Sequence, residues 1–241
     1  MANIGDAALL ASLFQQFENI IVLDVETTGI NPKYEEIIEL AAIRLEKGQD
    51  LSGPDPDREL DVLVKLSDGR RLPPVITELT GISEQQLAGE GVSKAHACGK
   101  LSALLHCKNP LLVAYNAQFD LCFLYYFLDR FGKAGCLQNV KMLDALTVYK
   151  DRRPYPHTLR DAVAAYELKT KNTHRAIDDA KATLELLCAM EEETGDLERY
   201  INLFGYNPKY GISGPKISSV KYLPQPYDMP NKLYERSLLP L

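Results

Sequence analysis

The segment DVETTG at residues 24–29 closes an apolar run and brings two acids close together. Side chains two residues apart on a strand point to the same face, so Asp24 and Glu26 are expected to share one pocket. Two neighbouring carboxylates repel unless a cation neutralises them, and such oxygen ligands suit Mg²⁺ or Mn²⁺. The motif alone leaves open an alternative, a solvated strand end in which residues 27–29 form an ordinary turn.

A second acid, Asp120, lies in YNAQFDLCFL at residues 115–124, within the first helical turn expected after a strand. The helix dipole favours an acid at this position, which is a purely structural explanation. The residues around Asp120 are almost all apolar, however, and a buried carboxylate needs a partner. We therefore expect Asp120 to have a function beyond stabilising the start of a helix.

The third segment, HRAIDDAKAT at residues 174–183, places His174 five residues before Asp179. Helical spacing puts Asp179, but not Asp178, on the apolar stripe formed by Ala176, Thr183, Leu186 and Met190. Asp179 is thus the inward carboxylate, and His174 at the helix start can turn toward the same pocket. The alternative is that both acids complement the helix dipole and that His174 is a surface residue.

Apolar runs and turn residues around these segments predict an α/β fold, a mixed sheet flanked by helices. Strands are expected at residues 20–25, 36–46, 60–66, 110–115 and 137–143. Helices are expected at residues 6–17, 73–79, 83–87, 93–107, 118–131, 144–150, 158–166, 174–193 and 196–203, with Ser83 and Ser93 as caps. Residues 1–18 form a leading helix, residues 19–204 the main domain, and residues 205–241 an extended tail rich in Pro and Tyr.

Composition limits the classes of partner. The formal net charge of −6 argues against a protein that grips long duplex DNA through nonspecific phosphate contacts. No apolar run reaches the ~20 residues of a membrane span, so a cytoplasmic protein without membrane contact is expected. The five cysteines form no CxxC pair and are expected to be reduced, buried thiols: Cys98, Cys107, Cys122, Cys136 and Cys188.

Together the three acidic segments match the DEDDh pattern, and the sequence resembles the proofreading exonuclease family of bacterial DNA polymerase III, the DnaQ-like or epsilon-like proteins. The resemblance covers about residues 19–190 and also includes LTGIS at residues 79–83. Four motifs in the right order make the match specific. One departure is Tyr115, where the family usually has His, and we expect it to affect local hydrogen bonding more than catalysis.

The resemblance implies a ribonuclease H-like, five-stranded mixed sheet and a 3′→5′ exonuclease that releases nucleoside monophosphates from DNA. It implies that Asp24, Glu26, Asp120 and Asp179 hold two divalent cations, Mg²⁺ or Mn²⁺, ~4 Å apart. It further assigns His174 as the general base that takes a proton from the attacking water.

The resemblance also implies substrate contacts. The backbone of residues 27–29 is expected to approach the terminal nucleotide, and apolar side chains are expected to pack on its bases. The polar candidates are Thr27, Thr28, Gly29 and Asn116, and the apolar candidates are Ile30, Leu79 and Phe123. Core packing is the competing explanation for each apolar candidate.

Three alternatives stay open. One is an exoribonuclease of the oligoribonuclease or RNase T kind, because sugar preference depends on contacts to the 2′-OH. Another is a non-catalytic nucleic-acid-binding module of the same fold. The third is an interaction protein, since residues 200–204 (YINLF) are similar to peptides that dock on sliding clamps, although helix packing explains them better. The expected partners are nucleic acid 3′ ends, with a DNA polymerase or a sliding clamp as candidates.

Overall fold

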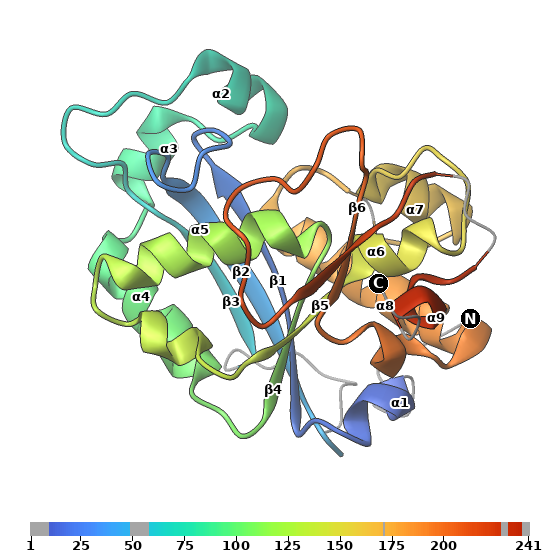
Figure 1. Cartoon of the computed structure of the whole chain (residues 1–241). Helices are drawn as coiled ribbons and strands as arrows, with labels where there is room; N and C mark the ends of the chain where they lie inside the picture. Colours follow the sequence, from blue (N-terminus) through green and yellow to red (C-terminus); the bar gives the residue numbers. More distant parts are fainter. Residues whose placement is uncertain (1–9, 49–57, 171, 228–230, 238–241) are drawn as a thin grey trace.

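A computed structural model describes residues 10–48, 58–170, 172–227 and 231–237, and its centre is a five-stranded sheet (Figure 1). The strand order is β3-β2-β1-β4-β5, with β2 antiparallel to β1 and β3, and with β4 and β5 parallel to β1. The strands are β1 (Asn19–Thr27), β2 (Ile37–Glu46), β3 (Glu59–Leu63), β4 (Pro110–Ala114) and β5 (Lys141–Asp144). The predicted fold class, a mixed five-stranded sheet flanked by helices, is confirmed.

Both faces of the sheet are covered, which explains the continuous apolar run of β1. Ile20 and Val22 pack into a core with α8, whereas Ile21 and Leu23 pack into a second core with α4 and α5 (Figure 1). The helices are α1 (Ala11–Phe14), α2 (Pro74–Thr80), α3 (Glu84–Gly89), α4 (Lys94–Leu105), α5 (Ala117–Asp129), α6 (Ala145–Lys150), α7 (Leu159–Ala165), α8 (Ala176–Thr194) and α9 (Leu233–Ser237), with 3₁₀ helices η2 (Ala134–Leu137) and η3 (Leu197–Tyr200).

The predicted caps are present. The Ser83 hydroxyl accepts the Gln86 backbone N–H at 3.2 Å in a capping box, and Ser93 accepts that of His96 at 3.2 Å. The leading helix is α1 in the described residues, whereas residues 6–9 of the prediction lie outside them. All five cysteines are free thiols, with Cys107 and Cys136 only half-buried. Within the described ranges, no helix is long and apolar enough to cross a membrane.

The helix predicted at residues 196–203 is wrong beyond its first turn. Only η3 forms, and Asn202 then adopts a left-handed backbone with φ of 57°. Its amide N–H donates to the Met142 carbonyl at 2.7 Å, and its side-chain oxygen accepts the Met142 N–H at 2.9 Å. This tie to β5 redirects the chain into a strand, β6 (Leu203–Tyr206), which pairs in parallel with β7 (Lys221–Pro224).

The segment after residue 204 is not a wholly extended tail. It contains β7 and α9, and it buries Val220, Leu223, Leu233 and Tyr234 in the two cores. Sequence periodicity missed this packing because each contact joins residues far apart in the chain. The proposed division at residues 18 and 204 stays a prediction, but the expectation of an extended tail is wrong for the residues that form β7 and α9.

The peptide at residues 200–204 is also part of the core. Tyr200 is 0% exposed and Phe204 is 2% exposed. Packing therefore explains this segment, as the sequence analysis favoured, and its apolar side chains are not displayed for docking on another protein.

Candidate active site

The sequence-predicted acids meet where β1 ends and where α5 and α8 begin. Asp24 and Glu26 lie near the C-terminal end of β1. Because β4 is parallel to β1, α5, which follows β4, begins at the same end of the sheet. Asp120 is buried in the first turn of α5, and its Oδ1 accepts the Val25 backbone N–H at 3.2 Å. This hydrogen bond ties α5 directly to β1 beside Asp24.

Burial and mutual repulsion dominate the electrostatics of this edge. Burial, followed by the nearby Asp120 and Glu26 carboxylates, raises the pKa of Asp24 well above its usual value. Burial, followed by Asp179 and Glu39, raises the pKa of Glu26 to about 8. Burial is also the main cause that raises the pKa values of Asp120 and Asp179. Carboxylates packed in this way need a cation to remain ionised together at neutral pH.

Glu26, His174 and Asp179 form a set of donors suited to one metal ion. One ligand atom from each lies within 4.8 Å of the other two. His174 is exposed and has a left-handed backbone, φ 57°, in the loop before α8, where the predicted helix start at 174 is two residues too early. The ring therefore reaches the acids from a loop, as the sequence led us to expect of a residue near the helix start.

Asp179 is the inward carboxylate of α8, as predicted. Its stripe of helical neighbours is buried, and its oxygens accept the Asn172 side-chain amide at 2.5 Å and the Thr173 backbone N–H at 3.1 Å. Asp178 instead is half-buried and accepts the Thr173 hydroxyl at 2.6 Å. The loop before α8 is thus folded onto both acids, but only Asp179 enters the cluster.

Sequence reasoning missed Glu39, which is 0% exposed and lies opposite Glu26 in the β1–β2 register. Its carboxylate accepts hydrogen bonds from the Arg175 guanidinium at 2.6 and 2.9 Å and from the Ala176 backbone N–H at 2.9 Å. Glu39 therefore holds Arg175 and the first residue of α8, and so fixes the position of the segment that contains His174 and Asp179. The signal was available, because an acid interrupts an otherwise apolar strand in EIIELAAI.

Asp144 has the same kind of role for α5 and was also missed. It is buried at the end of β5, where it accepts the Ala117 backbone N–H at 3.1 Å and the Thr147 hydroxyl at 2.7 Å. Burial raises its pKa, and the hydrogen bonds oppose that shift. Because Ala117 is the first residue of α5, Asp144 holds the turn that presents Asp120.

Three of the predicted substrate contacts are accessible. Ile30 is 88% exposed and Leu79 is 50% exposed, so both side chains are open to solvent. Asn116 is exposed at the start of α5, with a left-handed backbone and no side-chain cap bond. These three side chains remain candidates for contact with substrate.

The other predicted contacts are occupied or buried. The Thr27 hydroxyl donates to the Gly29 carbonyl at 2.6 Å, and the Thr28 hydroxyl donates to Glu35 at 2.5 Å while accepting the Glu36 N–H at 2.9 Å. Phe123 is 2% exposed in the core between α5 and the sheet, so its predicted role in packing on bases does not fit the structure. The period of α5 turns Phe123 inward.

Tyr115, the departure from the family pattern, is half-buried against the core. Its hydroxyl donates to the His157 carbonyl at 3.0 Å, and burial raises its pKa. The side chain thus joins β4 to the loop before α7.

The mixed sheet and the four converging acids define a ribonuclease H-like nuclease. The family model described as Exonuclease matches residues 21–187, most of the chain, and the chain belongs to this exonuclease family.

Similar proteins agree with this assignment. A PolC-type DNA polymerase III of Halalkalibacterium halodurans is 32% identical over 178 residues, which are 72% of this chain and 11% of that protein. One of Clostridium perfringens is 31% identical over 191 residues, 78% of this chain and 12% of that protein. The chain therefore spans only a small part of these relatives. The structure of E. coli exonuclease I with a dA16 oligonucleotide shares the fold, with a TM-score of 0.67 at 21% identity over 76% of this chain and 42% of that one.

Proposed function

We propose that this chain hydrolyses phosphodiester bonds from the 3′ end of single-stranded or frayed DNA and releases nucleoside monophosphates. The observation that carries the proposal is the convergence of Asp24, Glu26, Asp120 and Asp179 at one edge of the sheet, with His174 beside Glu26 and Asp179. All five side chains needed for the chemistry are present, which supports an enzyme over a non-catalytic module of the same fold.

The four acids would hold two divalent cations, Mg²⁺ or Mn²⁺. The raised pKa values support this, because burial and the carboxylates of Asp179, Glu39 and Asp120 disfavour the charged form of Glu26 more than Arg175 favours it. Cations held by these acids would neutralise the cluster and would supply positive charge to stabilise the attacking and leaving oxygens of an in-line displacement. The carboxylates also give the site its geometry, since β1, α5 and α8 hold them from three directions.

His174 would accept the proton of the attacking water. Neutral imidazole is the side chain best suited to this task near neutral pH. The hydrogen bonds of Asn172 and Thr173 to Asp179, and of Arg175 to Glu39, hold the loop on both sides of His174. The ring is therefore exposed to solvent yet kept near the acids, as a base that must exchange protons with water requires.

DNA is the proposed substrate because the relatives are DNA polymerases of the PolC type and the structural neighbours include complexes with single-stranded DNA. Work beside a DNA polymerase is part of the proposal for the same reason. A cytoplasmic location stays a prediction from the sequence. The buried packing of residues 200–204 does not support docking on a sliding clamp through that segment.

The test is digestion of 5′-labelled single-stranded DNA, matched RNA and a duplex with a mispaired 3′ end, each with Mg²⁺, Mn²⁺ or EDTA. We expect a ladder of progressively shortened DNA with either metal and none with EDTA. Faster digestion of RNA would favour the exoribonuclease alternative. Absence of shortened products from all three substrates would refute the proposed activity.

A further inference from the structure

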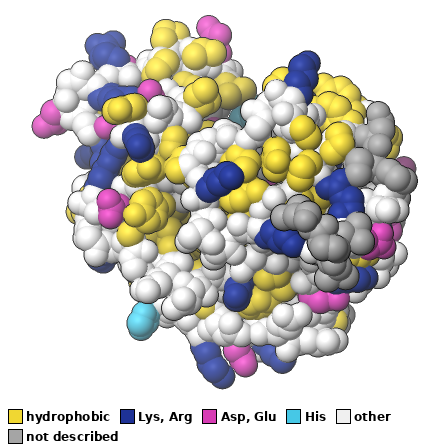
Figure 2. Space-filling model, viewed as in Figure 1, with side chains coloured by type: hydrophobic (Ala, Val, Ile, Leu, Met, Phe, Trp, Pro, Cys, Tyr) yellow, Lys and Arg dark blue, Asp and Glu magenta, His cyan; other side chains and the backbone are white. Residues whose placement is uncertain are grey.

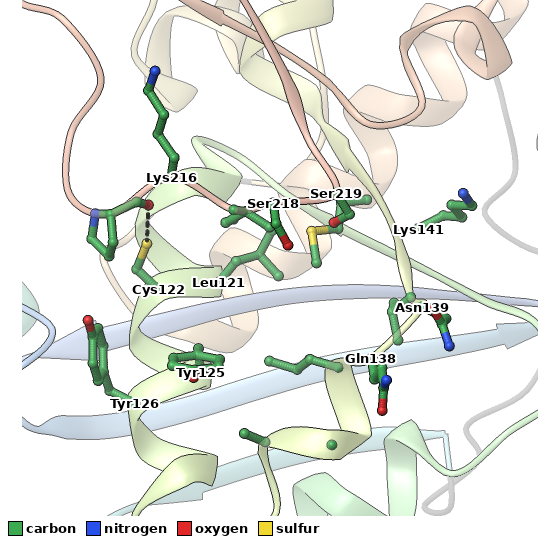
Figure 3. Close-up of a pocket in the computed structure, with 17 residues that line it drawn as sticks. Leu121, Cys122, Tyr125, Tyr126, Gln138, Asn139, Lys141, Lys216, Ser218 and Ser219 are labelled. Atoms are coloured by element: carbon green, nitrogen blue, oxygen red, sulfur yellow. Dashed lines mark hydrogen bonds between the residues drawn. The ribbon is translucent and has the colours of Figure 1, made fainter.

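A cavity of about 800 Å³ lies beside α5 (Figure 3). One wall is the outward face of α5, with Cys122, Tyr125 and Tyr126, and the other walls are η2, the start of β5 and residues 215–219. At 3.6 residues per turn, these three α5 side chains point roughly opposite to Asp120. The cavity is thus on the opposite side of α5 from Asp120.

The lining of this cavity differs in charge from the rest of the protein. The chain has more acidic than basic residues, 33 Asp and Glu against 27 Lys and Arg, yet no Asp or Glu is among the described residues that line the cavity. Lys141 and Lys216 stand at its rim and extend outward, and Gln138, Asn139, Ser218 and Ser219 add uncharged polar groups (Figure 3). An anionic or hydrogen-bonding ligand is favoured over a cationic one.

Basic side chains from the loop after β1 and from the end of α5 lie close to Tyr126, one of the residues that line the cavity. The Lys33 ammonium, in the loop that follows β1, lies 6.0 Å from the centroid of the Tyr126 ring. Arg130, at the end of α5, donates to the Lys33 carbonyl at 3.1 Å. On the face shown in Figure 2, Lys and Arg side chains also occupy the middle, while Asp and Glu lie mostly toward the edges.

The C-terminal segment forms a fixed wall. The Gln118 side-chain amide, on a residue that is 8% exposed, donates to the carbonyls of Ser213 at 2.9 Å and Pro215 at 2.7 Å. Its oxygen accepts the Tyr222 hydroxyl at 2.6 Å. The segment is therefore fastened to α5 one turn from the cavity, so the cavity exists before any ligand arrives.

We propose that this cavity binds nucleotides of the single strand whose 3′ end occupies the active site, an inference that rests on the proposed function. Tyr125 is 47% exposed and offers a ring for sequence-tolerant stacking on a base. Lys141 and Lys216 would neutralise phosphates, and the side-chain amides of Gln138 and Asn139 would bond to base edges. Long strands would then bind more tightly than short ones, although both place the same kind of 3′ end at the catalytic acids.

The test measures binding separately from hydrolysis. The full chain is titrated into 5′-fluorescent single-stranded DNA, either long or three nucleotides in length, with EDTA present to prevent cleavage. We expect the double variant K141E/K216E to lose tenfold or more in affinity for the long strand, with a smaller loss for the trinucleotide. The slope of log affinity against log salt should become shallower by about 1.4, because each lysine contact on a single strand contributes ~0.7.

Three variants serve as controls and refinements. Lys47→Glu changes an exposed lysine at the end of β2 away from the acids, and it should leave affinity and salt slope as in the parent protein. Tyr125→Ala should weaken binding of the long strand about tenfold, whereas Tyr125→Phe, which keeps the ring, should not. Circular dichroism of each variant establishes that it is folded.

The outcomes separate the two proposals. Unchanged affinity of folded K141E/K216E for the long strand, or equal losses in K141E/K216E and Lys47→Glu, would overturn the inference. Competition by an acidic peptide for the cavity without binding of DNA would also overturn it. Lysine-dependent binding of the long strand without hydrolysis in Mg²⁺ or Mn²⁺ would support the inference and refute the exonuclease proposal.

Discussion

On the side of α5 that faces β1, Asp120 is 3% exposed and lies among other carboxylates, whereas on the outward side Tyr125 is 47% exposed and lines the same cavity as Lys141 and Lys216. Both sides are proposed to contact the same polyanion. The inner side can do so only through cations, because its own charge repels phosphate. The outer side can attract phosphate directly and is therefore expected to respond to salt, which screens exposed charges far more than buried ones.

The largest expected effect is on hydrolysis and comes from one substitution on the inner side of α5, where the acids lie. Asp24→Asn should reduce hydrolysis to background, because Asp24 lies beside Asp120, Glu26 and Asp179 and is one of the four acids proposed to hold the cations. Binding of a long single strand in EDTA should persist. The matched control is Asp178→Asn, whose carboxylate lies outside the cluster and should retain most of the activity. Near-normal turnover of Asp24→Asn would contradict the metal assignment.

The next effect concerns His174, which is exposed while the acids beside it are mostly buried. His174→Ala should lower turnover about 10²–10⁴-fold, the usual contribution of general-base catalysis. The concentration of Mn²⁺ needed for half-maximal activity should change little if the imidazole is a base. A large rise in that concentration would instead make His174 a ligand, which the 4.8 Å grouping with Glu26 and Asp179 also permits.

A smaller effect is expected from Glu39, which holds α8 without entering the proposed chemistry. Glu39→Gln weakens the bonds to Arg175 and Ala176 and should lower turnover about tenfold while raising the Mn²⁺ requirement. The control, Glu46→Gln, breaks the surface pair with Arg44 at the other end of β2 and should change neither value. Loss of stability in Glu39→Gln with an unchanged Mn²⁺ requirement would limit Glu39 to a folding role.

The smallest effect is on stability against pH without metal. The pKa of Glu26 is raised from 4.5 to about 8 on folding, so its favourable contribution is complete below pH 4.5 and is lost as pH rises through 8. The free energy of unfolding in EDTA should therefore fall by a few kcal/mol between pH 5 and pH 9. Mn²⁺ should remove most of that fall. Equal slopes with and without Mn²⁺ would show that the cluster does not bind the metal.

Several site residues were predictable because their chemistry is local. The i, i+2 spacing of Asp24 and Glu26, and the helical stripe of Asp179, require only the geometry of a strand and a helix. The acid within the apolar strand made Glu39 visible, but the sequence could not show what Glu39 and Asp144 hold, since their partners, Ala176 and Ala117, are distant in sequence. Phe123 was misassigned because an apolar residue on a helix can face the core or the surface, and only packing decides which.

The sequence by itself determined the order of the main strands and helices up to α8, the mixed α/β class and the candidate acids, because periodicity and motif spacing are properties of neighbouring residues. Only the tertiary structure decided that residues 205–227 and 231–237 complete the core, through the pairing of β6 with β7 and the burial of Leu223 and Leu233. It alone also revealed the cavity beside α5, because residues 121–126 and 215–219 meet there from distant parts of the chain. Contacts of this kind follow from how the whole chain excludes water, which no local pattern encodes.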